Sequence, residues 1–560
     1  MDHWTWILLA AILLSLAWLF PRAGDSLFRP VESFFSRLAS KPHASLALLF
    51  FGTILFRLAL LPLIPVPVPG VHDEFSYLLA ADTFAHGRLA NPPHPLWLSF
   101  DTFHINMLPT YSSMFPPAQG MVLALGQLLG HPWIGVLLSC AALCAAIAWM
   151  LQAWLPARWA LLGGLIAFLK LAVVSYWINS YFGGAVAALG GALVLGALPR
   201  LFRSHKIRHV LLLALGLALL ANSRPFEGLA FSLPVAAALL WWLVRSPSPS
   251  FSIKLRRVLL PLASLLLLTA GFIAYYNWRT TGDALLMPHA LNRRAHPFTL
   301  FLWQPVRTHS LYSNPQFDDF YNGWVLKTGF QGTWADFWRI QREKVSTYSD
   351  VYLWKGSLFP FLFLPLLFSS RRWLFLLLVL ASCSVSLLVV GWSLPHYAAP
   401  ALCAFYALLL QCLRHLRSWR FAGRHAGLLL SRVLFLLLLF TVASDFRLRF
   451  ADPLAWRWNG DIGFARRASV AADFNRLPGK HLVLVRYSPA HIVGQEWVYN
   501  SADIDSSKVV WARELDAQQN RKLLAYFHDR QAWLLQPDDH PGELLPYASP
   551  DNSVPPAPHP

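Results

Sequence analysis

The sequence predicts a polytopic all-helical membrane domain followed by a small extracytoplasmic α/β domain. Charged residues make up only 13% of the 560 residues and hydrophobic residues 56%, whereas about 25% charge is usual in soluble domains. Apolar stretches close to the ~20 residues that cross a bilayer recur along the chain. Basic residues are concentrated in every second connecting loop, as expected for a multi-pass membrane protein.

About twelve apolar segments are candidates for membrane-spanning helices. They cover residues 4–20, 44–64, 132–154, 159–177, 184–200, 209–221, 228–244, 258–276, 356–369, 373–392, 396–413 and 426–443. A cleaved signal peptide is the alternative for the first segment, but the start Met-Asp-His has no positive charge and no small-residue cleavage site follows. We therefore expect an uncleaved first span.

The distribution of basic residues predicts the orientation of the chain. A net charge of +18 also occurs in nucleic-acid-binding proteins, but here the basic residues mark alternate loops, so we expect a membrane bilayer and no nucleic acid as partner. By the positive-inside rule, both termini and residues 65–130, 178–183, 222–227, 277–355 and 445–560 lie outside. The loops expected in the cytoplasm contain Arg22, Arg29, Arg37, Lys41, Arg158, Arg200, Arg203, Lys206, Arg208, Arg245, Lys254, Arg256, Arg257, Arg371, Arg372, Arg414, Arg417, Arg420 and Arg424.

The chain divides into a membrane domain (1–444) with external loops 65–130 and 277–355, an α/β domain (445–545) and a tail (546–560). The second domain is predicted from short apolar segments at 481–487, 508–514 and 532–537, which are typical of strands. They alternate with helical patterns at 461–477 and 516–529, and this alternation favours an α/β fold. The tail is rich in proline and is predicted to be disordered.

The clearest candidate for chemistry is the tripeptide His72-Asp73-Glu74. It directly follows the second apolar segment and is expected at the outer face of the membrane. Acidic residues at membrane depth are costly and are commonly functional. The structural alternative is that Asp73 and Glu74 stabilise the start of the following helix, where negative charge meets the positive end of the helix dipole.

Four short motifs resemble the GT-C superfamily of membrane glycosyltransferases, which includes protein O-mannosyltransferases and lipid A aminoarabinose transferases. They are HDE at 72–74, MFPPAQG at 114–120, LANSRPFEG at 220–228 and LPHYAAP at 394–400. Their order and predicted topology carry the resemblance, which covers the membrane domain to about residue 413. The segment NSYFGG at 179–184 resembles a bacterial subgroup of this superfamily.

The resemblance implies an inverting transfer of a sugar from a polyprenyl-phosphate carrier to an extracytoplasmic glycan, lipid or protein, in a bacterial inner membrane. It implies that Asp73 is the catalytic base, and Glu74 is the next acid. No cofactor is expected, since the lipid-linked sugar is itself the donor. We expect a metal-independent reaction because residues 178–183 contain no acid, whereas a hard cation needs several oxygen ligands.

Arg224 is the first candidate for holding the carrier phosphate, because a planar guanidinium suits phosphate oxygens and its turn is expected at head-group depth. A structural pairing with Glu227 is the alternative. Arg293 and Arg294 are weaker candidates. The other candidates for substrate binding are His72, Asp101, His104, Tyr111, Asn179, Tyr181, His396 and Tyr397.

Two other classes of protein fit a bundle of about twelve spans. A transporter or flippase of lipid-linked glycans is one, although transporters usually place polar groups near the bilayer midplane. Here acidic residues are nearly absent from the span centres, and the polar motifs are predicted at one face. A catalytically silent scaffold is the other. The sequence favours an enzyme with its chemistry at the outer surface.

Overall fold

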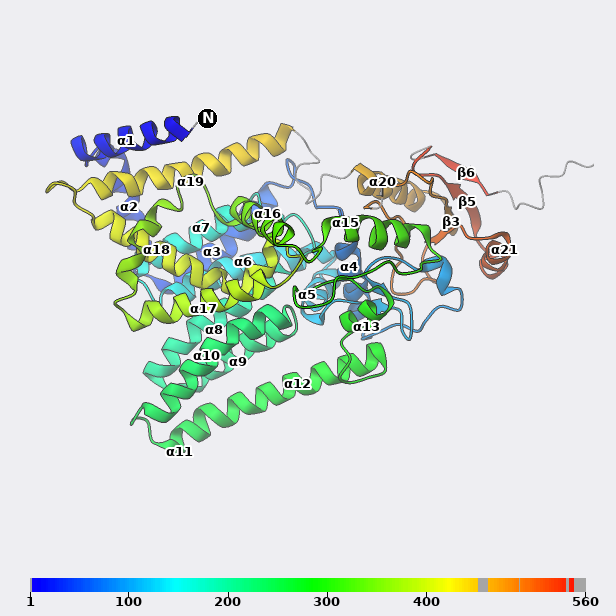
Figure 1. Ribbon diagram of the computed structural model, residues 1–560, viewed down its shortest axis with the longest axis horizontal. Coiled ribbons are helices and arrows are strands. Elements are labelled where there is room, and N and C mark those ends of the chain that lie inside the picture. Colours follow the sequence, from blue (N-terminus) through cyan, green and yellow to red (C-terminus); the bar gives the residue numbers. More distant parts are fainter. Residues whose placement is uncertain (1–2, 452–461, 493, 540–542, 548–560) are drawn as a thin grey trace, which may run out of the picture.

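The computed structural model describes residues 3–451, 462–492, 494–539 and 543–547. Most of these residues are helical (Figure 1). The membrane part contains α1 (His3–Leu19), α2 (Asp25–Ala39), α3 (Pro42–Ala59), α6 (Pro132–Leu151), α7 (Ala157–Leu171), α8 (Gly184–Ser204), α9 (Ile207–Ala221), α10 (Pro225–Arg245), α11 (Phe251–Lys254), η2 (Leu255–Leu259), α12 (Leu260–Thr281), η4 (Phe359–Leu367), α17 (Arg371–Leu388), η5 (Pro395–Ala401), α18 (Leu402–Ser418) and α19 (Ala426–Ala451).

Eight helices of the described chain are long and apolar enough to cross a membrane, which confirms a multi-pass helical domain. They cover Pro42–Ala59, Pro132–Leu151, Gly184–Ser204, Pro225–Arg245, Phe251–Thr281, Arg371–Leu388, Pro395–Ser418 and Ala426–Leu448. Of the other predicted spans, α1 has 17 residues and α7 and α9 have 15 each. The segment predicted at 356–369 forms only a nine-residue 3-10 helix, η4, because Pro360 and Pro365 cannot donate helical hydrogen bonds.

Close helix contacts in the bundle depend on glycine. A Cβ atom on Gly191 would lie 2.2 Å from the carbonyl oxygen of Pro400, and one on Gly190 would lie 3.0 Å from that of Gly216. These positions therefore let α8 approach η5 and α9 at backbone distance, as small residues do in membrane helices. All five cysteines of the chain are buried and free.

The segments predicted to lie outside the membrane gather at one end of the bundle. They contain α4 (His72–Ala85), η1 (Trp97–Phe100), β1 (Ile105–Asn106), β2 (Ser112–Ser113), α5 (Pro117–Leu128), α13 (Pro288–Ala295), α14 (Pro315–Phe317), η3 (Asp318–Val325), α15 (Leu326–Thr328) and α16 (Trp334–Tyr352). In Figure 1, α4, α5 and α13 lie near the C-terminal sheet, and α11 lies at the opposite end. This arrangement agrees with the predicted alternation of loops.

The C-terminal part is the α/β domain that the sequence predicts. Its elements are α20 (Ile462–Arg476), β3 (His481–Val485), β4 (Val509–Arg513), α21 (Ala517–Tyr526), β5 (Gln531–Leu535) and β6 (Leu544–Pro546). The strand order is β4-β3-β5-β6, with β3 parallel to both neighbours and β6 antiparallel to β5. Residues 548–560, most of the predicted tail, lie outside the described residues.

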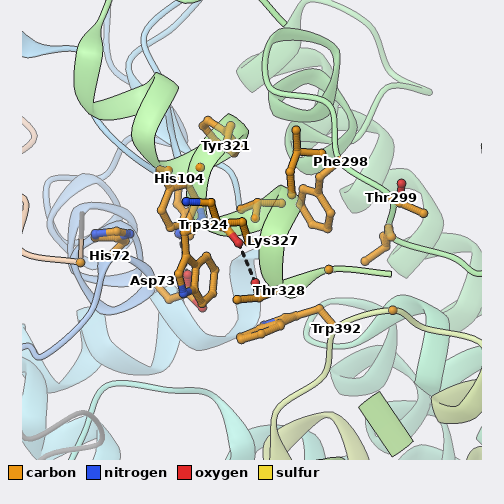
Figure 2. A pocket seen from close by; sticks show the side chains of 18 of the residues that line it. His72, Asp73, His104, Phe298, Thr299, Tyr321, Trp324, Lys327, Thr328 and Trp392 are labelled. Atoms are coloured by element: carbon orange, nitrogen blue, oxygen red, sulfur yellow. Dashed lines mark hydrogen bonds and ion pairs between the residues drawn. The ribbon is translucent and has the colours of Figure 1, made fainter. Parts of the chain in front are cut away.

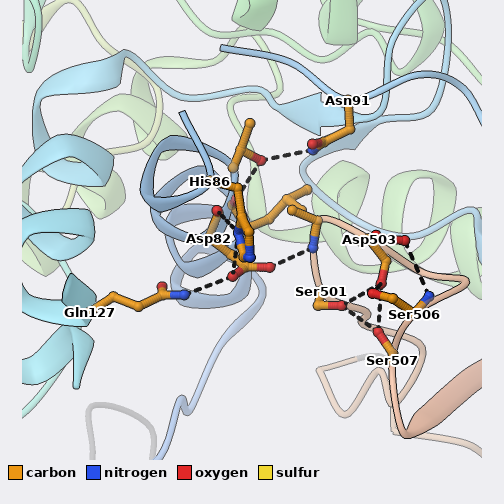
Figure 3. A network of polar contacts seen from close by, with 11 residues as sticks. Asp82, His86, Asn91, Gln127, Ser501, Asp503, Ser506 and Ser507 are labelled. Atoms are coloured by element: carbon orange, nitrogen blue, oxygen red, sulfur yellow. Dashed lines mark hydrogen bonds and ion pairs between the residues drawn. The ribbon is translucent and has the colours of Figure 1, made fainter. Parts of the chain in front are cut away.

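This domain packs on the first external loop and shares a hydrophobic core with it. Leu79, Phe100, Ile105, Met107 and Tyr111 of the loop join Leu482, Leu484, Val510 and Leu523 of the domain. The rings of Phe75 and Tyr499 stack at 4.1 Å. Asp82 bridges the two parts, because its carboxylate accepts hydrogen bonds from the Gln127 amide at 2.7 Å and from the Ala502 backbone N–H at 2.7 Å (Figure 3). The loop and the domain therefore form one unit.

Candidate active site

A cavity of about 990 Å³ opens at the end of the bundle where the external segments gather. Its walls come mainly from five parts of the chain. They are the start of α4, the turn before β1, the segment from α13 to residue 331, the 391–397 turn, and residues 489–492 and 494 of the C-terminal domain. Met114, Phe115, Phe182 and Thr347 also line the cavity. Figure 2 shows Asp73 and His104 on one side of this cavity, with Thr299 and Trp392 on another.

Asp73 lies in the first turn of α4 and lines the cavity. Its Oδ1 atom is 2.6 Å from Nδ1 of His104, and their side chains are 21% and 14% exposed. Burial alone would raise the pKa of Asp73, but the nearby His104 and Arg224 outweigh it and hold the pKa below its usual value. Asp73 is therefore an ionised carboxylate that remains accessible from the cavity.

The backbone of His104 is fixed in an unusual conformation. Its φ angle of 61° lies in the left-handed region, which residues other than glycine rarely adopt. Its carbonyl oxygen accepts hydrogen bonds from the Ser76 hydroxyl at 2.6 Å and from the Met114 backbone N–H at 3.2 Å. These two contacts hold the imidazole beside Asp73, and strained residues of this kind are common at functional sites.

The other two residues of the HDE motif differ in exposure to the cavity. His72 lines it and stacks on Phe103 at 4.4 Å, and burial lowers the pKa of His72 to about 3, so the ring is neutral. Glu74 is buried and accepts a hydrogen bond from the Gly70 backbone N–H at 3.3 Å, and it is not among the cavity-lining residues. Both Asp73 and Glu74 lie in the first helical turn, where the dipole favours them.

Arg293, on α13, lines the cavity. Its Nε and Nη1 atoms are buried and make no hydrogen bond within the described part of the chain. The guanidinium lies over the ring of Phe298, with Cζ 3.2 Å from the ring centroid. Burial lowers the pKa of Arg293 to about 10, so it is still charged at neutral pH. Arg294, its neighbour, is exposed and does not line the cavity.

Arg224 lies just behind the cavity wall. It is the N-cap residue of α10, and its Cζ atom is 3.9 Å from the ring centroid of Tyr397, which does line the cavity. Glu227 is buried in the first turn of α10. His396 is also buried, and its Nδ1 atom lies 3.0 Å from the Tyr176 hydroxyl. The Arg-Pro-Glu and Pro-His-Tyr motifs thus meet through Arg224 and Tyr397.

Four other predicted residues lie outside the cavity. The Tyr111 hydroxyl donates to the Asn500 carbonyl at 3.1 Å, and Tyr181 donates to the Pro67 carbonyl at 2.9 Å. Asn179 accepts a hydrogen bond from the buried Arg57 at 3.0 Å. The Asp101 carbonyl oxygen accepts one from Arg513 of the C-terminal domain at 3.4 Å. These contacts are structural.

Several cavity residues were not predicted from the sequence. His289 lies one turn before Arg293, and burial lowers the pKa of His289 to about 3. Trp324 and Trp392 are 41% and 40% exposed, and their rings meet edge to face at 5.2 Å. Lys327 and Phe320 complete this wall. The cluster of aromatic residues in FYNGWVLKTGF was the available sequence indication.

The arrangement offers a proton acceptor and an anion-binding group in one cavity. Asp73 is an ionised carboxylate beside an imidazole, and Arg293 has buried N–H groups with no partner in the part of the chain that the structure describes. Aromatic rings cover the side formed by Trp324 and Trp392. Such a cavity can accept a proton from a hydroxyl group and bind a phosphate group, with apolar or sugar-like surfaces against the rings.

Searches with the sequence match no protein-family model and no curated protein. In structure, the chain is similar to ArnT, an aminoarabinose transferase, from Cupriavidus metallidurans. ArnT in the apo state has a TM-score of 0.47 and 14% identity, covering 87% of this chain and 92% of ArnT. ArnT bound to undecaprenyl phosphate gives the same score and identity, covering 88% and 92%.

The chain is also similar to the oligosaccharyltransferase AglB from Archaeoglobus fulgidus in complex with an inhibitory peptide and a dolichol-phosphate. The TM-score is 0.38 and the identity 9%, over 89% of this chain and 69% of AglB. ArnT and AglB are members of the GT-C superfamily, which the sequence motifs resemble. The likeness is one of general architecture, and it assigns no role to any residue of this chain.

Proposed function

We propose that this chain is an inverting glycosyltransferase that moves a sugar from a polyprenyl-phosphate carrier to an extracytoplasmic acceptor. The observation that supports this most strongly is the presence of Asp73 and the unsatisfied guanidinium of Arg293 in one cavity at the end of a membrane-embedded bundle. ArnT and AglB, whose architecture is similar, have been observed with undecaprenyl phosphate and dolichol-phosphate. The acceptor is a glycan, a lipid or a protein.

In the proposed reaction, Asp73 accepts the proton of the acceptor hydroxyl as its oxygen attacks the anomeric carbon of the sugar. The bond between that carbon and the carrier phosphate oxygen breaks, and the bonding electrons leave with the phosphate. His104 stabilises and orients the carboxylate, since its Nδ1 atom is 2.6 Å away. Attack from the side opposite the leaving phosphate inverts the anomeric carbon.

Arg293 stabilises the charge that develops on the leaving phosphate. A buried guanidinium whose N–H groups lack partners is suited to this role, because charge-assisted hydrogen bonds to phosphate are strong in a site of low dielectric. Arg224 acts from behind the wall by holding Tyr397. This assignment gives the direct phosphate contact to Arg293 and a positioning role to Arg224, the residue that the sequence favoured for the phosphate.

The test is Asp73→Asn, which keeps the shape of the side chain and removes the proton acceptor. Membranes containing the protein are supplied with radiolabelled polyprenyl-phosphate sugars, and consumption of the donor is measured. We expect the rate to fall by a factor on the order of 100 or more, with carrier binding retained. Asp336→Asn, which changes an acid on α16 outside the cavity, is the control and should consume donor at the normal rate.

Two outcomes contradict the proposal at different levels. Full activity of Asp73→Asn refutes the base assignment and makes Asp319, the other carboxylate among the described lining residues, the next candidate. If the wild-type protein consumes no polyprenyl-phosphate sugar but moves a lipid-linked glycan across vesicle membranes, the chain is a flippase and the proposed function fails.

A further inference from the structure

A second cavity, of about 360 Å³, lies at the end of the bundle away from the candidate active site. It is formed by the first turn of α7 and the last turns of α18. Its lining consists of Arg158, Trp159, Gln411, Arg414, His415, Arg417 and Ser418. Three of these residues are arginines and none is acidic, so the cavity has a strong positive charge.

Two of the three arginines are not neutralised. Arg417 forms an ion pair with Glu32 at 2.9 Å. By contrast, no carboxylate of the described residues lies within ion-pair distance of Arg158 or Arg414. Arg414 donates to the Gln411 side-chain oxygen at 2.7 Å, which orients its guanidinium. Arg158 and Arg414 line the same cavity, and their positive charges repel each other unless an anion lies between them.

The helix beside this cavity marks the depth of the membrane surface. α2 packs against α7 and carries exposed apolar side chains at one-turn spacing, namely Leu27, Val31 and Phe34, which are 67%, 46% and 62% exposed. An exposed apolar stripe on an otherwise polar helix is typical of a helix that lies in the membrane interface. The cavity next to it is therefore at the level of the lipid head groups.

The acidic residues of α2 are paired with arginines of the protein. Arg432, which is only 3% exposed, binds Asp25 at 2.7 Å and Glu32 at 3.0 Å. Their negative charges are thus neutralised within the protein. What remains toward the membrane is the apolar stripe and the basic cavity, an arrangement that attracts negatively charged lipids.

We infer that the cavity between α7 and α18 binds the phosphate head group of an anionic phospholipid, with Arg158 and Arg414 as its two cationic ligands. By the charge pattern of the loops, this end faces the cytoplasm, where anionic lipids attract basic segments. A glycerophospholipid fits, because its phosphate reaches the arginines from head-group depth while its acyl chains stay in the bilayer. This inference is independent of the proposed catalytic function.

The experiment measures binding of a short-chain fluorescent phosphatidylglycerol to the purified full-length protein in detergent. Arg158→Gln/Arg414→Gln removes both cationic ligands. Because each basic residue near an anionic surface contributes about a fivefold gain in affinity, we expect a loss of roughly 25-fold. Arg256→Gln/Arg257→Gln makes the same charge change at exposed positions of η2 outside the cavity and should bind within twofold of wild type.

Additional variants and lipids identify the ligand and separate loss of binding from misfolding. Arg158→Lys/Arg414→Lys should retain most of the binding, and a phosphatidylcholine analogue should not bind. If the double glutamine variant does not fold, Arg158→Gln alone, at an exposed position, should weaken binding about fivefold. Equal loss in the cavity and control variants, or equal binding of phosphatidylcholine, overturns the inference. Displacement of the lipid by equimolar inorganic phosphate would assign the site to a free anion instead.

Discussion

Replacement of Arg293 by glutamine should weaken carrier binding strongly. The Nε and Nη1 atoms of Arg293 are buried and have no hydrogen-bond partner among the described residues, so the lipid phosphate is expected to be their acceptor. A hydrogen bond to a charged group contributes about 1.5 to 3 kcal/mol, which corresponds to a rise in Kd of about 10- to 150-fold if one such bond is lost. The same replacement should raise the melting temperature of the unliganded protein, because a buried charge without partners is removed.

The assay is a titration of the purified protein with undecaprenyl phosphate, followed by tryptophan fluorescence. Trp324 and Trp392 line the cavity and are half exposed, so they will report its occupation. Arg294→Gln is the matched control, since this neighbour is exposed and lies outside the cavity. We expect it to bind normally. Unchanged affinity of Arg293→Gln, or equal weakening by Arg294→Gln, would refute the assignment.

Three further predictions concern other parts of the protein. Arg224→Ala should weaken undecaprenyl phosphate binding by about tenfold or more. Arg224→Lys should restore only part of this binding, because a point charge cannot replace a planar guanidinium over Tyr397. Normal binding by Arg224→Ala would show that Tyr397 does not need Arg224 to hold it in place. Burial raises the pKa of Asp101 from 3.8 to about 7, so its contribution to stability is complete below about pH 4 and is lost as the pH rises through 7. Asp101→Asn should therefore gain melting temperature relative to wild type between pH 4 and 8, and a constant difference across this range would contradict the shift. Finally, a reporter that fluoresces only in the cytoplasm should stay dark when fused after residue 560, and a bright signal would reverse the predicted orientation.

The C-terminal domain was the part most accurately predicted from the sequence. The predicted segments 481–487 and 508–514 contain β3 and β4, and the segment 532–537 matches β5 except that the strand begins one residue earlier, at Gln531. The segments 461–477 and 516–529 contain the observed helices, whereas the short strand β6 was not predicted. Short apolar segments alternating with amphipathic helices leave few alternatives. The apolar membrane segments were also identified, although η4 shows that apolar composition alone does not define a span when prolines interrupt the helix.

The cavity was predicted only in part. Asp73 and Tyr397 follow or begin apolar segments, so their place at the outer end of the bundle could be inferred. Which of Arg224 and Arg293 lines the cavity could not be inferred from the sequence. It depends on the position of α13, which belongs to a long loop without a periodic pattern. Trp324 belongs to an irregular helix, η3, and Trp392 to a turn, and neither has a local sequence pattern that predicts their contact.

The core that the first external loop shares with the C-terminal domain sets the order in which the protein matures. The Tyr111 hydroxyl and its acceptor, the carbonyl of Asn500, are 389 residues apart in the chain. At ribosomal rates of about 5 to 20 residues per second, the C-terminal part is synthesised on the order of 20 to 80 s after the loop. During this time Phe100 and Ile105 lack the part of their core that the C-terminal domain supplies. The segment that carries Asp73 and His104 therefore reaches its final form only after the C-terminal domain has been synthesised.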